Sequence, residues 1–303
     1  MPETKFHLVG IGELLWDCFE DERKPGGAPA NVAFHAKQLG MDATIVSRVG
    51  KDPLGEELLE FLRAHDLDTT HIQLDNSHLT GTVTVEMVRA DHPQYTIHEN
   101  VAWDHIQFDE HLRALCSTAN AICFGTLAQR SPVSRQTILD CINAAKNAIK
   151  IYDVNLRPPH YDRATIEASL NACDGAKFND EESEVLAALL ELPIPSLEQF
   201  ASAMMAQFEL DAVCITKGGQ GSLFLTANES ATAPSPPIKV ADTVGAGDAF
   251  TAAVAYAQLN QWNAKATATF ANQFAGNIAA QFGAMPSIDP NTIQKLQQTA
   301  QDA

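Results

Sequence analysis

The sequence predicts an α/β domain in three layers, with a mostly parallel sheet covered by helices and a small β-sheet lid. Short apolar runs rich in β-branched residues alternate with longer stretches of helical period, as in parallel sheets with helical crossovers. Two regions, about residues 14–25 and 71–103, interrupt this alternation with extended segments. We expect a single domain over residues 1–303, with the lid formed by these two insertions.

The expected elements follow one another along the chain in βα order. The predicted strands are Phe6–Ile11, Thr44–Val49, Ala121–Phe124, Lys150–Val154, Ala176–Phe178, Ala212–Thr216 and Ser222–Thr226. The predicted helices are Ala30–Leu39, Gly55–His65, Pro132–Ile149, Ala164–Ala172, Glu181–Leu189, Leu197–Phe208, Asp248–Leu259 and Lys265–Phe282. In the second insertion, Thr82–Val88 and Tyr95–His98 are predicted to form a hairpin around Ala90–Pro93. A hairpin without a crossover fits a separate β-layer better than the parallel sheet.

Composition and charge exclude several classes of function. The 303 residues are 45% hydrophobic and 19% charged, as in globular proteins, and acidic residues outnumber basic ones by 38 to 20. The net charge of −18 argues against nucleic-acid and membrane partners. No apolar run approaches the roughly 18 residues that span a bilayer, and no secretory signal is visible, so we expect a cytoplasmic protein. The six cysteines form no Cys-x-x-Cys pair and are predicted to be reduced core residues.

Two glycine-containing segments resemble nucleotide-binding motifs only superficially. Gly10-Ile11-Gly12 follows a strand, but Leu15 occupies the third glycine position of a dinucleotide fingerprint and the next residues look extended rather than helical. Gly50-Lys51-Asp52 lacks the loop and the hydroxyl residue of a P-loop. We therefore expect neither site.

The segment from Asp242 to Asp248, with sequence DTVGAGD, carries the strongest chemical signal. Its small residues let phosphate oxygens approach the main chain, and the alanine-rich stretch that follows predicts a helix whose N-terminus faces the same point. Such an anion hole needs no basic side chain, which would suit an acidic protein if it had to bind an anion such as ATP. Asp248 could take a proton from an acceptor hydroxyl or could simply cap the helix, and the sequence leaves both interpretations open.

An N-terminal segment offers hydroxyl-binding groups. In Pro25-Gly26-Gly27-Ala28-Pro29-Ala30-Asn31, paired glycines would let a ligand lie against main chain, and Asn31 supplies a donor and acceptors. Asp17 lies upstream and could accept two sugar hydroxyl hydrogen bonds. An ordinary loop before a helix, and a plain turn at Asp17, explain the same residues.

With these motifs in order along the chain, the sequence resembles the ribokinase/PfkB family of carbohydrate kinases, and within it the bacterial fructokinases. The matching segments are Gly12–Asp17, Gly26–Asn31, Gly50–Gly55 and Asp242–Asp248. The resemblance spans nearly the whole chain and implies a ribokinase-like fold, ATP and Mg²⁺ as cofactors, and phosphoryl transfer from ATP to a sugar, with fructose the preferred acceptor. It also implies a homodimer through the lid.

The resemblance assigns roles to individual residues. Asp248 would be the catalytic base, with Gly245, Ala246 and Gly247 as the anion hole, and Asp17, Gly27 and Asn31 would hold the sugar. Asn179 and Glu182 look like the family's Asn-x-x-Glu element, which helps place Mg²⁺ through water. The nucleotide would contact Thr216, Lys217, Gly218, Gly219 and Gly221, with Asn272 near the adenine. A charged helix N-terminus at Asn179 and a hairpin turn at Gly218 are the structural alternatives.

Two assignments are less direct. Some family members bind a monovalent cation such as K⁺ through backbone oxygens, and the equivalent positions here are Asp242, Val244, Ile278, Gln281, Gly283 and Ser287. The run from Asp153 to Pro158, with sequence DVNLRP, departs from the fructokinase pattern, which often has Asp-Pro-Asn before its arginine. Arg157 would contact substrate or phosphate, or else pair with a structural carboxylate. The competing hypotheses are a kinase that acts on another acceptor, either the carboxylated sugar 2-keto-3-deoxygluconate or ribose, and a sugar-binding regulator without catalysis.

Overall fold

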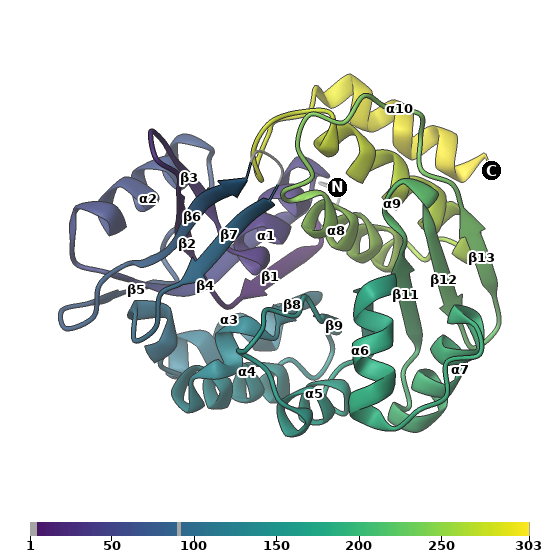
Figure 1. Cartoon of the computed structure of the whole chain (residues 1–303), viewed down its shortest axis with the longest axis horizontal. Coiled ribbons are helices and arrows are strands. Elements are labelled where there is room, and N and C mark those ends of the chain that lie inside the picture. The colour runs from purple at the N-terminus through teal and green to yellow at the C-terminus, as the bar shows by residue number, and fades with distance from the viewer. Residues whose placement is uncertain (1–4, 90–91, 303) are drawn as a thin grey trace.

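A nine-stranded sheet forms the centre of the computed structural model, which describes residues 5–89 and 92–302 (Figure 1). Its strand order is β13-β12-β11-β10-β9-β8-β1-β4-β5. The strands are β1 (His7–Ile11), β4 (Asp42–Gly50), β5 (Ile72–Asp75), β8 (Ala121–Gly125), β9 (Ile149–Asp153), β10 (Gly175–Asn179), β11 (Ala212–Thr216), β12 (Ser222–Thr226) and β13 (Ser230–Ala233). All neighbours pair in parallel except β11–β12 and β12–β13. The predicted mostly parallel sheet is confirmed.

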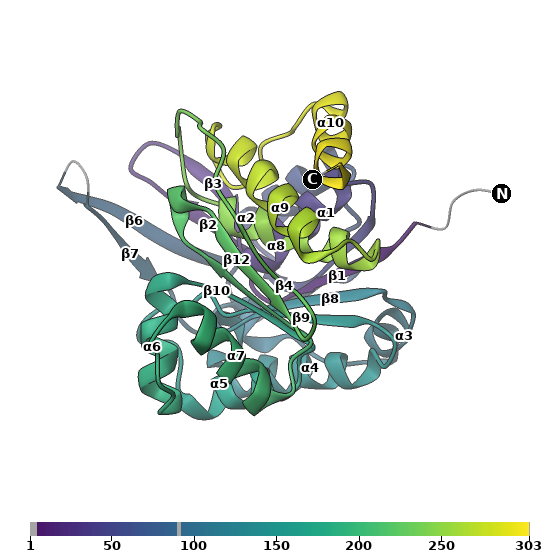
Figure 2. The ribbon, with the colours of Figure 1, turned by 90° about the vertical axis from the view of Figure 1, so that its right-hand side faces the viewer.

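Helices cover both faces of this sheet (Figure 2). One layer contains α1 (Ala28–Gln38), α8 (Ala246–Leu259), α9 (Ala264–Ala279) and α10 (Pro290–Gln301). The other contains α3 (Glu110–Thr118), α4 (Pro132–Ala144), α5 (Arg163–Leu170), α6 (Asp180–Leu190) and α7 (Leu197–Phe208). A further helix, α2 (Pro53–Ala64), packs beside β4 and the small sheet. The three predicted layers are therefore present.

Alternation along the central strand explains why two cores form. In β1, Leu8 packs into the core under α1, whereas Val9 and Ile11 pack into the core of the opposite face. Gly10 lies where α1 approaches most closely, since a Cβ there would be 2.2 Å from the carbonyl oxygen of Pro29. The missing side chain lets the start of α1 sit directly on the carboxyl end of β1, where the strand order reverses and open α/β sheets bind ligands.

A second sheet of four strands stands apart from the first, in the order β3-β2-β6-β7. It contains β2 (Leu15–Cys18), β3 (Arg23–Gly26), β6 (Gly81–Arg89) and β7 (His92–Ile97). The β2–β6 pair is parallel and the other two are antiparallel, so the sheet is mixed. Ala90 and Asp91, at the predicted turn, lie outside the described residues. After Gly12 the chain forms strand β2, where a dinucleotide-binding fingerprint would need a helix.

The structure corrects several predicted boundaries. Ile72–Asp75, assigned from the sequence to the lid insertion, instead pairs with β4 at the edge of the main sheet. The helix predicted over Pro132–Ile149 ends at Ala144, because Ile149 already donates its N–H to the Asn120 carbonyl as β9 begins. The helix predicted over Lys265–Phe282 ends at Ala279. Elements β5, β13, α3 and α10 were missed, since they are short or bury few apolar side chains.

The cysteines and hydropathy agree with the sequence prediction. All six cysteines are free thiols and all but Cys18 are buried. Among the described residues, no helix is both long enough and apolar enough to span a membrane.

Candidate active site

A cavity of about 530 Å³ opens at the carboxyl ends of the central strands, beneath the small sheet. The structure brings most of the predicted sugar and phosphate residues to its wall. The predicted residues that line it are Asp17, Gly27, Asn31, Arg157, Asp242, Val244, Gly245, Gly247 and Asp248. Side chains of the small sheet, among them Val83 and Ile97, complete the lining. Segments more than 200 residues apart in sequence therefore converge on one space, as the family resemblance implies.

Asp248 lies in the first turn of α8 but does not cap it. The N-cap is Gly245, and the Asp248 carboxylate instead accepts a hydrogen bond from the Asn31 side chain, with 2.7 Å between Oδ2 and Nδ2. The side chain is only 9% exposed. Burial and the nearby Asp153 carboxylate raise the pKa of Asp248 to about 7, against the hydrogen bond from Asn31 and the positive charges of Lys177 and Arg157. A carboxylate with a pKa near neutrality is suited to accept a proton.

The N-terminus of α8 supplies neutral donors beside this carboxylate. Gly245 has a φ of 78°, and a Cβ there would be 2.5 Å from the carbonyl oxygen of Ala284, so only glycine fits. No side chain caps the helix, but the N–H of Ala246 donates to the Thr243 carbonyl at 3.3 Å, and Ala246 does not line the cavity. The N–H groups of Gly247 and Asp248, which do line it, lack a side-chain partner. At Gly247, a Cβ would come within 3.0 Å of the Lys177 ammonium. Main-chain N–H groups, the helix dipole and one ammonium thus meet where an anion would lie.

A buried ion pair supports the floor of the cavity. The Lys177 ammonium lies 3.1 Å and 3.2 Å from the two carboxylate oxygens of Asp153, and both side chains are at least nine-tenths buried. Thr251 of α8 donates a hydrogen bond to Asp153 Oδ2 at 2.7 Å. Burial alone would lower the pKa of Lys177, but the carboxylates of Asp153, Glu182 and Asp248 raise it. Lys177 therefore stays charged.

Two further acids line the sugar side of the cavity. Burial raises the pKa of Asp17 to about 6, although the charges of Arg157 and Lys24 oppose the shift. Glu13 accepts the Ala28 N–H with one carboxylate oxygen at 3.0 Å, while the other is buried and has no partner among the described residues. Burial raises the pKa of Glu13 as well. Unused acceptors of this kind suit the hydroxyl donors of a sugar.

Arg157 is exposed at the cavity wall and donates to its own neighbour, the Leu156 carbonyl, at 3.0 Å. It forms no ion pair with a carboxylate in residues 5–89 and 92–302, so the structural-carboxylate interpretation is not supported. The guanidinium is free to meet an acceptor or a phosphate.

Asn179 and Glu182 form a capping box at the start of α6, outside the cavity. Asn179 Oδ1 accepts the Glu182 N–H at 2.7 Å, and Glu182 Oε2 accepts the Asn179 N–H at 2.8 Å. Glu182 Oε1 also accepts the Leu156 N–H at 2.8 Å, which ties α6 to the segment that carries Arg157. The geometry thus establishes that these two residues cap α6, and their role in placing Mg²⁺ stays a prediction.

The predicted nucleotide loop joins two antiparallel strands. Thr216 ends β11, and Gly218–Gln220 form a short 3₁₀ turn closed by one hydrogen bond from the Lys217 N–H to the Gly221 carbonyl at 2.7 Å. Asn272 is buried in α9, where its amide donates to Ser222 Oγ at 2.7 Å and to the Ala268 carbonyl at 2.7 Å. None of these residues lines the cavity. The turn geometry matches a hairpin, and the Asn272 amide joins α9 to β12 through hydrogen bonds inside the core.

The predicted cation positions lie in two segments, one at 242–244 before α8 and one at 278–287 at and after the end of α9. The Asp242 carboxylate joins the two segments, because it accepts the N–H of Val244 and the N–H of Gly283, each at 3.0 Å. The Ile278 carbonyl already accepts the Gln281 N–H, and Ser287 is exposed. Groups of three or more metal-binding His, Cys, Asp or Glu side chains are absent from the part of the chain that the structure describes.

The sequence analysis missed three site residues, Glu13, Asp153 and Lys177. A signal existed for Lys177, because a lysine in the otherwise apolar run Ala176–Phe178 must find a buried partner. Asp153 ends the neighbouring strand and is that partner.

The comparisons with known proteins agree with this geometry. Residues 4–291 match the family model described as pfkB family carbohydrate kinase. The chain belongs to this family. An uncharacterized sugar kinase of Pyrococcus horikoshii is 31% identical over 265 residues, which cover 82% of this chain and 81% of that protein. A fructokinase of Klebsiella pneumoniae is 27% identical over 250 residues, covering 80% and 77%.

Solved structures show the ribokinase-like fold. A 2-dehydro-3-deoxygluconokinase of Thermotoga maritima superposes with a TM-score of 0.86 at 19% identity, covering 97% of this chain and 99% of the other. A fructokinase of Vibrio cholerae, solved with fructose, ADP and potassium, gives a TM-score of 0.82 at 24% identity, covering 96% and 98%. Family membership makes this PfkB chain an ATP-dependent sugar kinase, a phosphotransferase with an alcohol group as acceptor.

We expect Lys177→Met to lower the free energy of unfolding by about 3–5 kcal/mol, because it leaves the Asp153 carboxylate buried and unpaired. Urea denaturation measures the change. Arg113→Met, which breaks an exposed pair with Glu110, is the matched control and should have a far smaller effect. The double variant Lys177→Met/Asp153→Leu should recover part of the loss. A Lys177→Met protein as stable as the control would contradict the role of the pair.

Proposed function

We propose that this kinase transfers the γ-phosphoryl group of ATP to the primary hydroxyl of D-fructose, giving fructose 6-phosphate and ADP. The supporting observation is one cavity that holds a buried carboxylate of raised pKa, an uncapped helix N-terminus and a polar wall. The similarity to the Klebsiella pneumoniae fructokinase favours fructose among the acceptors.

Asp248 would act as the base. Asn31 orients its carboxylate by donating to Oδ2, which leaves Oδ1 to accept the proton of the acceptor hydroxyl. The main-chain N–H groups at Gly245 and Gly247 would stabilise the charge of the transferring phosphoryl group, and the Ala246 N–H would join them on leaving the Thr243 carbonyl. The small sheet would act as a lid that excludes water, since transfer to water competes with transfer to the sugar.

Asp17, Gly27 and Asn31 would hold the sugar. Asp17 lies on β2 of the small sheet, so sugar binding would connect this sheet with α1. Asn31 Oδ1 is buried and has no partner among the described residues, which suits a sugar hydroxyl donor. Gly27 adopts a φ of 115° and lies against the Glu13 carbonyl, so the main chain forms the wall there.

The nucleotide would lie over the carboxyl ends of β10 and β11. Thr216, Lys217, Gly218, Gly219, Gly221 and Asn272 remain its proposed contacts. Mg²⁺ would neutralise phosphate charge, and it keeps several waters when bound. Each Glu182 oxygen accepts one N–H and retains a lone pair, so Glu182 and Asn179 could hold such a water. A monovalent cation near the Asp242 loop and a homodimer through the lid are part of the same proposal.

A second acceptor class is favoured by one observation. The free guanidinium of Arg157 at the cavity wall would suit the carboxylate of 2-keto-3-deoxygluconate. The likeness to the Thermotoga maritima 2-dehydro-3-deoxygluconokinase shows only a shared fold.

The proposal predicts that fructose gives the highest kcat/KM in an acceptor panel with Mg-ATP and KCl. ADP release would be measured with fructose, ribose, 2-keto-3-deoxygluconate, tagatose, glucose and adenosine. Arg157→Gln separates the two acceptor classes, because loss of a cationic partner should impair a carboxylated acceptor far more than fructose. Preference for 2-keto-3-deoxygluconate, lost in Arg157→Gln, would replace fructose with the carboxylated acceptor. Silence on all acceptors would favour an untested acceptor or a sugar-binding regulator.

Asp248→Asn should lower turnover by at least ~10²-fold while sugar binding is largely kept, because the amide cannot accept the hydroxyl proton. Steady-state ADP release and equilibrium sugar titration measure the two quantities. The amide has the same shape as the carboxylate, so packing against Asn31 is retained. Turnover that survives this change would rule out Asp248 as the base.

The pH dependence should report the same carboxylate. Asp248 must be ionised to accept a proton, and its pKa is raised to about 7. We therefore expect kcat/KM to rise with pH through about 7 and then level off. A profile that is flat from pH 5.5 to 8.5 would contradict this assignment.

A further inference from the structure

The strand β7 of the small sheet brings two side chains, those of Tyr95 and Ile97, to the wall of the first cavity. It is an edge strand, and in the part of the chain that the structure describes it pairs only with β6. Ladder hydrogen bonds therefore hold it on one side alone. Its place over the cavity depends on how its end is fixed to the main domain, and His98, which follows β7, makes that connection.

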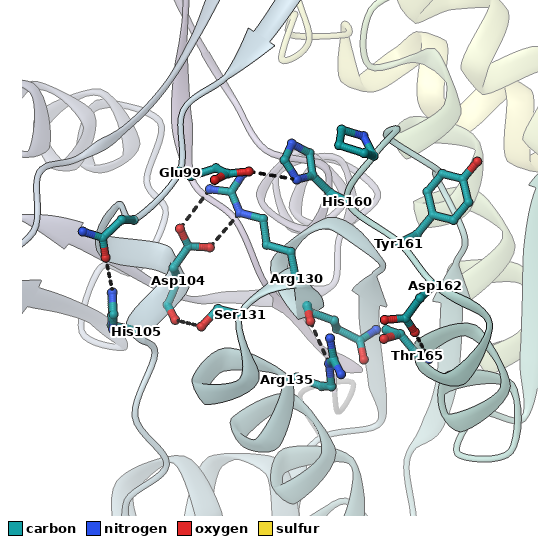
Figure 3. A pocket seen from close by; sticks show the side chains of 13 residues that line it. Glu99, Asp104, His105, Arg130, Ser131, Arg135, His160, Tyr161, Asp162 and Thr165 are labelled. Carbon is teal, nitrogen blue, oxygen red and sulfur yellow. Dashed lines mark hydrogen bonds and ion pairs between the residues drawn. The ribbon is translucent and has the colours of Figure 1, made fainter.

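Arg130 holds the end of β7 through the main chain of His98. Its Nη2 donates to the His98 carbonyl at 2.6 Å. Nη2 and Nε also donate to the two Asp104 carboxylate oxygens, at 2.9 Å and 2.8 Å. The Trp103 ring lies under the guanidinium, with 4.0 Å between the ring centroid and Cζ. Figure 3 shows Arg130 and Asp104 at the wall of a second cavity, of about 480 Å³. These contacts keep the guanidinium in one position.

The 3₁₀ helix η2 (Leu127–Arg130), which ends at this arginine, is itself fixed to the strand ends of the main sheet. Thr126, just before η2, is hydrogen-bonded to the Tyr152 hydroxyl of β9 at 2.6 Å. Leu127, in the same turn, lines the first cavity. Arg130 therefore connects the small sheet to the part of the main domain that forms the opposite wall of that cavity.

The other end of the β6–β7 hairpin has an anchor of its own. Thr80, just before β6, donates its N–H and its hydroxyl to the two Asp52 carboxylate oxygens, each at 2.8 Å. Gly81 lies against the Trp103 ring, since a Cβ there would be 2.2 Å from the indole nitrogen. Loss of the Arg130 bond would leave this end in place and free the β7 end, so the hairpin could move relative to the cavity.

We propose that Arg130 is a positioning residue for acceptor binding, which holds β7 where Tyr95 and Ile97 cover the first cavity. Arg130 does not line that cavity, so it would act on the acceptor only through the small sheet. It would raise the fraction of molecules whose small sheet covers the cavity, and with it the apparent affinity for the acceptor and the exclusion of water. This consequence rests on the proposed function, whereas the anchoring itself does not.

Arg130→Lys removes the anchor and keeps a charge opposite Asp104. A lysine side chain ends one bond before the position of Nη2, so its ammonium can pair with the carboxylate but falls short of the His98 carbonyl. The KM for fructose, or for whichever acceptor the panel favours, should rise about fivefold or more, while kcat changes less than about twofold. ADP should also form in excess of sugar phosphate, because a displaced sheet admits water.

Arg135→Lys is the matched control. Arg135 lines the same second cavity, but its Nε donates to the Gln129 carbonyl at 2.8 Å, within the main domain. This variant should keep the KM of the parent protein and equal yields of ADP and sugar phosphate. An Arg130→Lys protein with unchanged KM and equal yields, or with losses of stability and kcat alone, would make Arg130 a structural residue and overturn the proposal.

Hydrogen–deuterium exchange tests the anchor without any acceptor. Peptides covering residues 92–98 should exchange faster in Arg130→Lys than in the parent, while peptides covering β8 should not change. If Arg130→Lys does not fold, Arg130→Gln/Asp104→Asn removes the anchor without leaving an unpaired charge, and the same results are expected. Unchanged exchange at residues 92–98 would overturn the anchor. Turnover of no acceptor would contradict the proposed function, and exchange would still decide whether Arg130 holds the hairpin.

Discussion

The buried ion pair between Lys177 and Asp153 is the interaction on which the site depends. The two residues are register partners on neighbouring parallel strands, β10 and β9, so their side chains leave the sheet on the same face. Thr251 of α8 donates to the same Asp153 carboxylate. One carboxylate therefore fixes the helix N-terminus relative to the strand ends. Displacement of either charge would move the N-terminus of α8 and Asp248 together.

The same pair resolves an electrostatic conflict. A protein with a net charge of −18 must bind a polyanionic nucleotide, yet the cavity that the structure describes at the strand ends is lined by only three basic side chains, those of Lys24, Arg157 and Lys177. The N–H groups of α8 and the Lys177 ammonium provide positive potential at one place on its wall. The Asp153 charge that holds Lys177 also raises the pKa of Asp248, which burial raises further. Structural support and proton affinity thus arise from one arrangement of charges.

The sequence predicted the parts of the structure that depend on local pattern. Apolar runs located seven of the nine strands of the main sheet. The resemblance to the family, carried by its motifs, implied that Asp17, Asn31 and Asp248 share one site. Short or weakly apolar elements escaped detection, since α10 buries only Ile293 and Ala300. The Lys177–Asp153 pair escaped because pairing between strands is a property of register, not of neighbouring residues. At Asn179 and Glu182, the Asn-x-x-Glu pattern also satisfies a capping box, so pattern alone cannot separate the two roles.

Arg157 combines a fixed main chain with a free side chain. Its guanidinium forms no ion pair within the described residues, although its charge acts on Asp17 and Asp248, and it lines the cavity. Its main chain is not free, because Glu182 of the capping box holds the adjacent Leu156 N–H. The backbone is therefore fixed from the α6 side, and Asp162 fixes the other end of the segment by capping α5. Only the side chain of Arg157 is then left to adapt to an acceptor, so acceptor choice would be decided at its guanidinium and not by movement of the main chain.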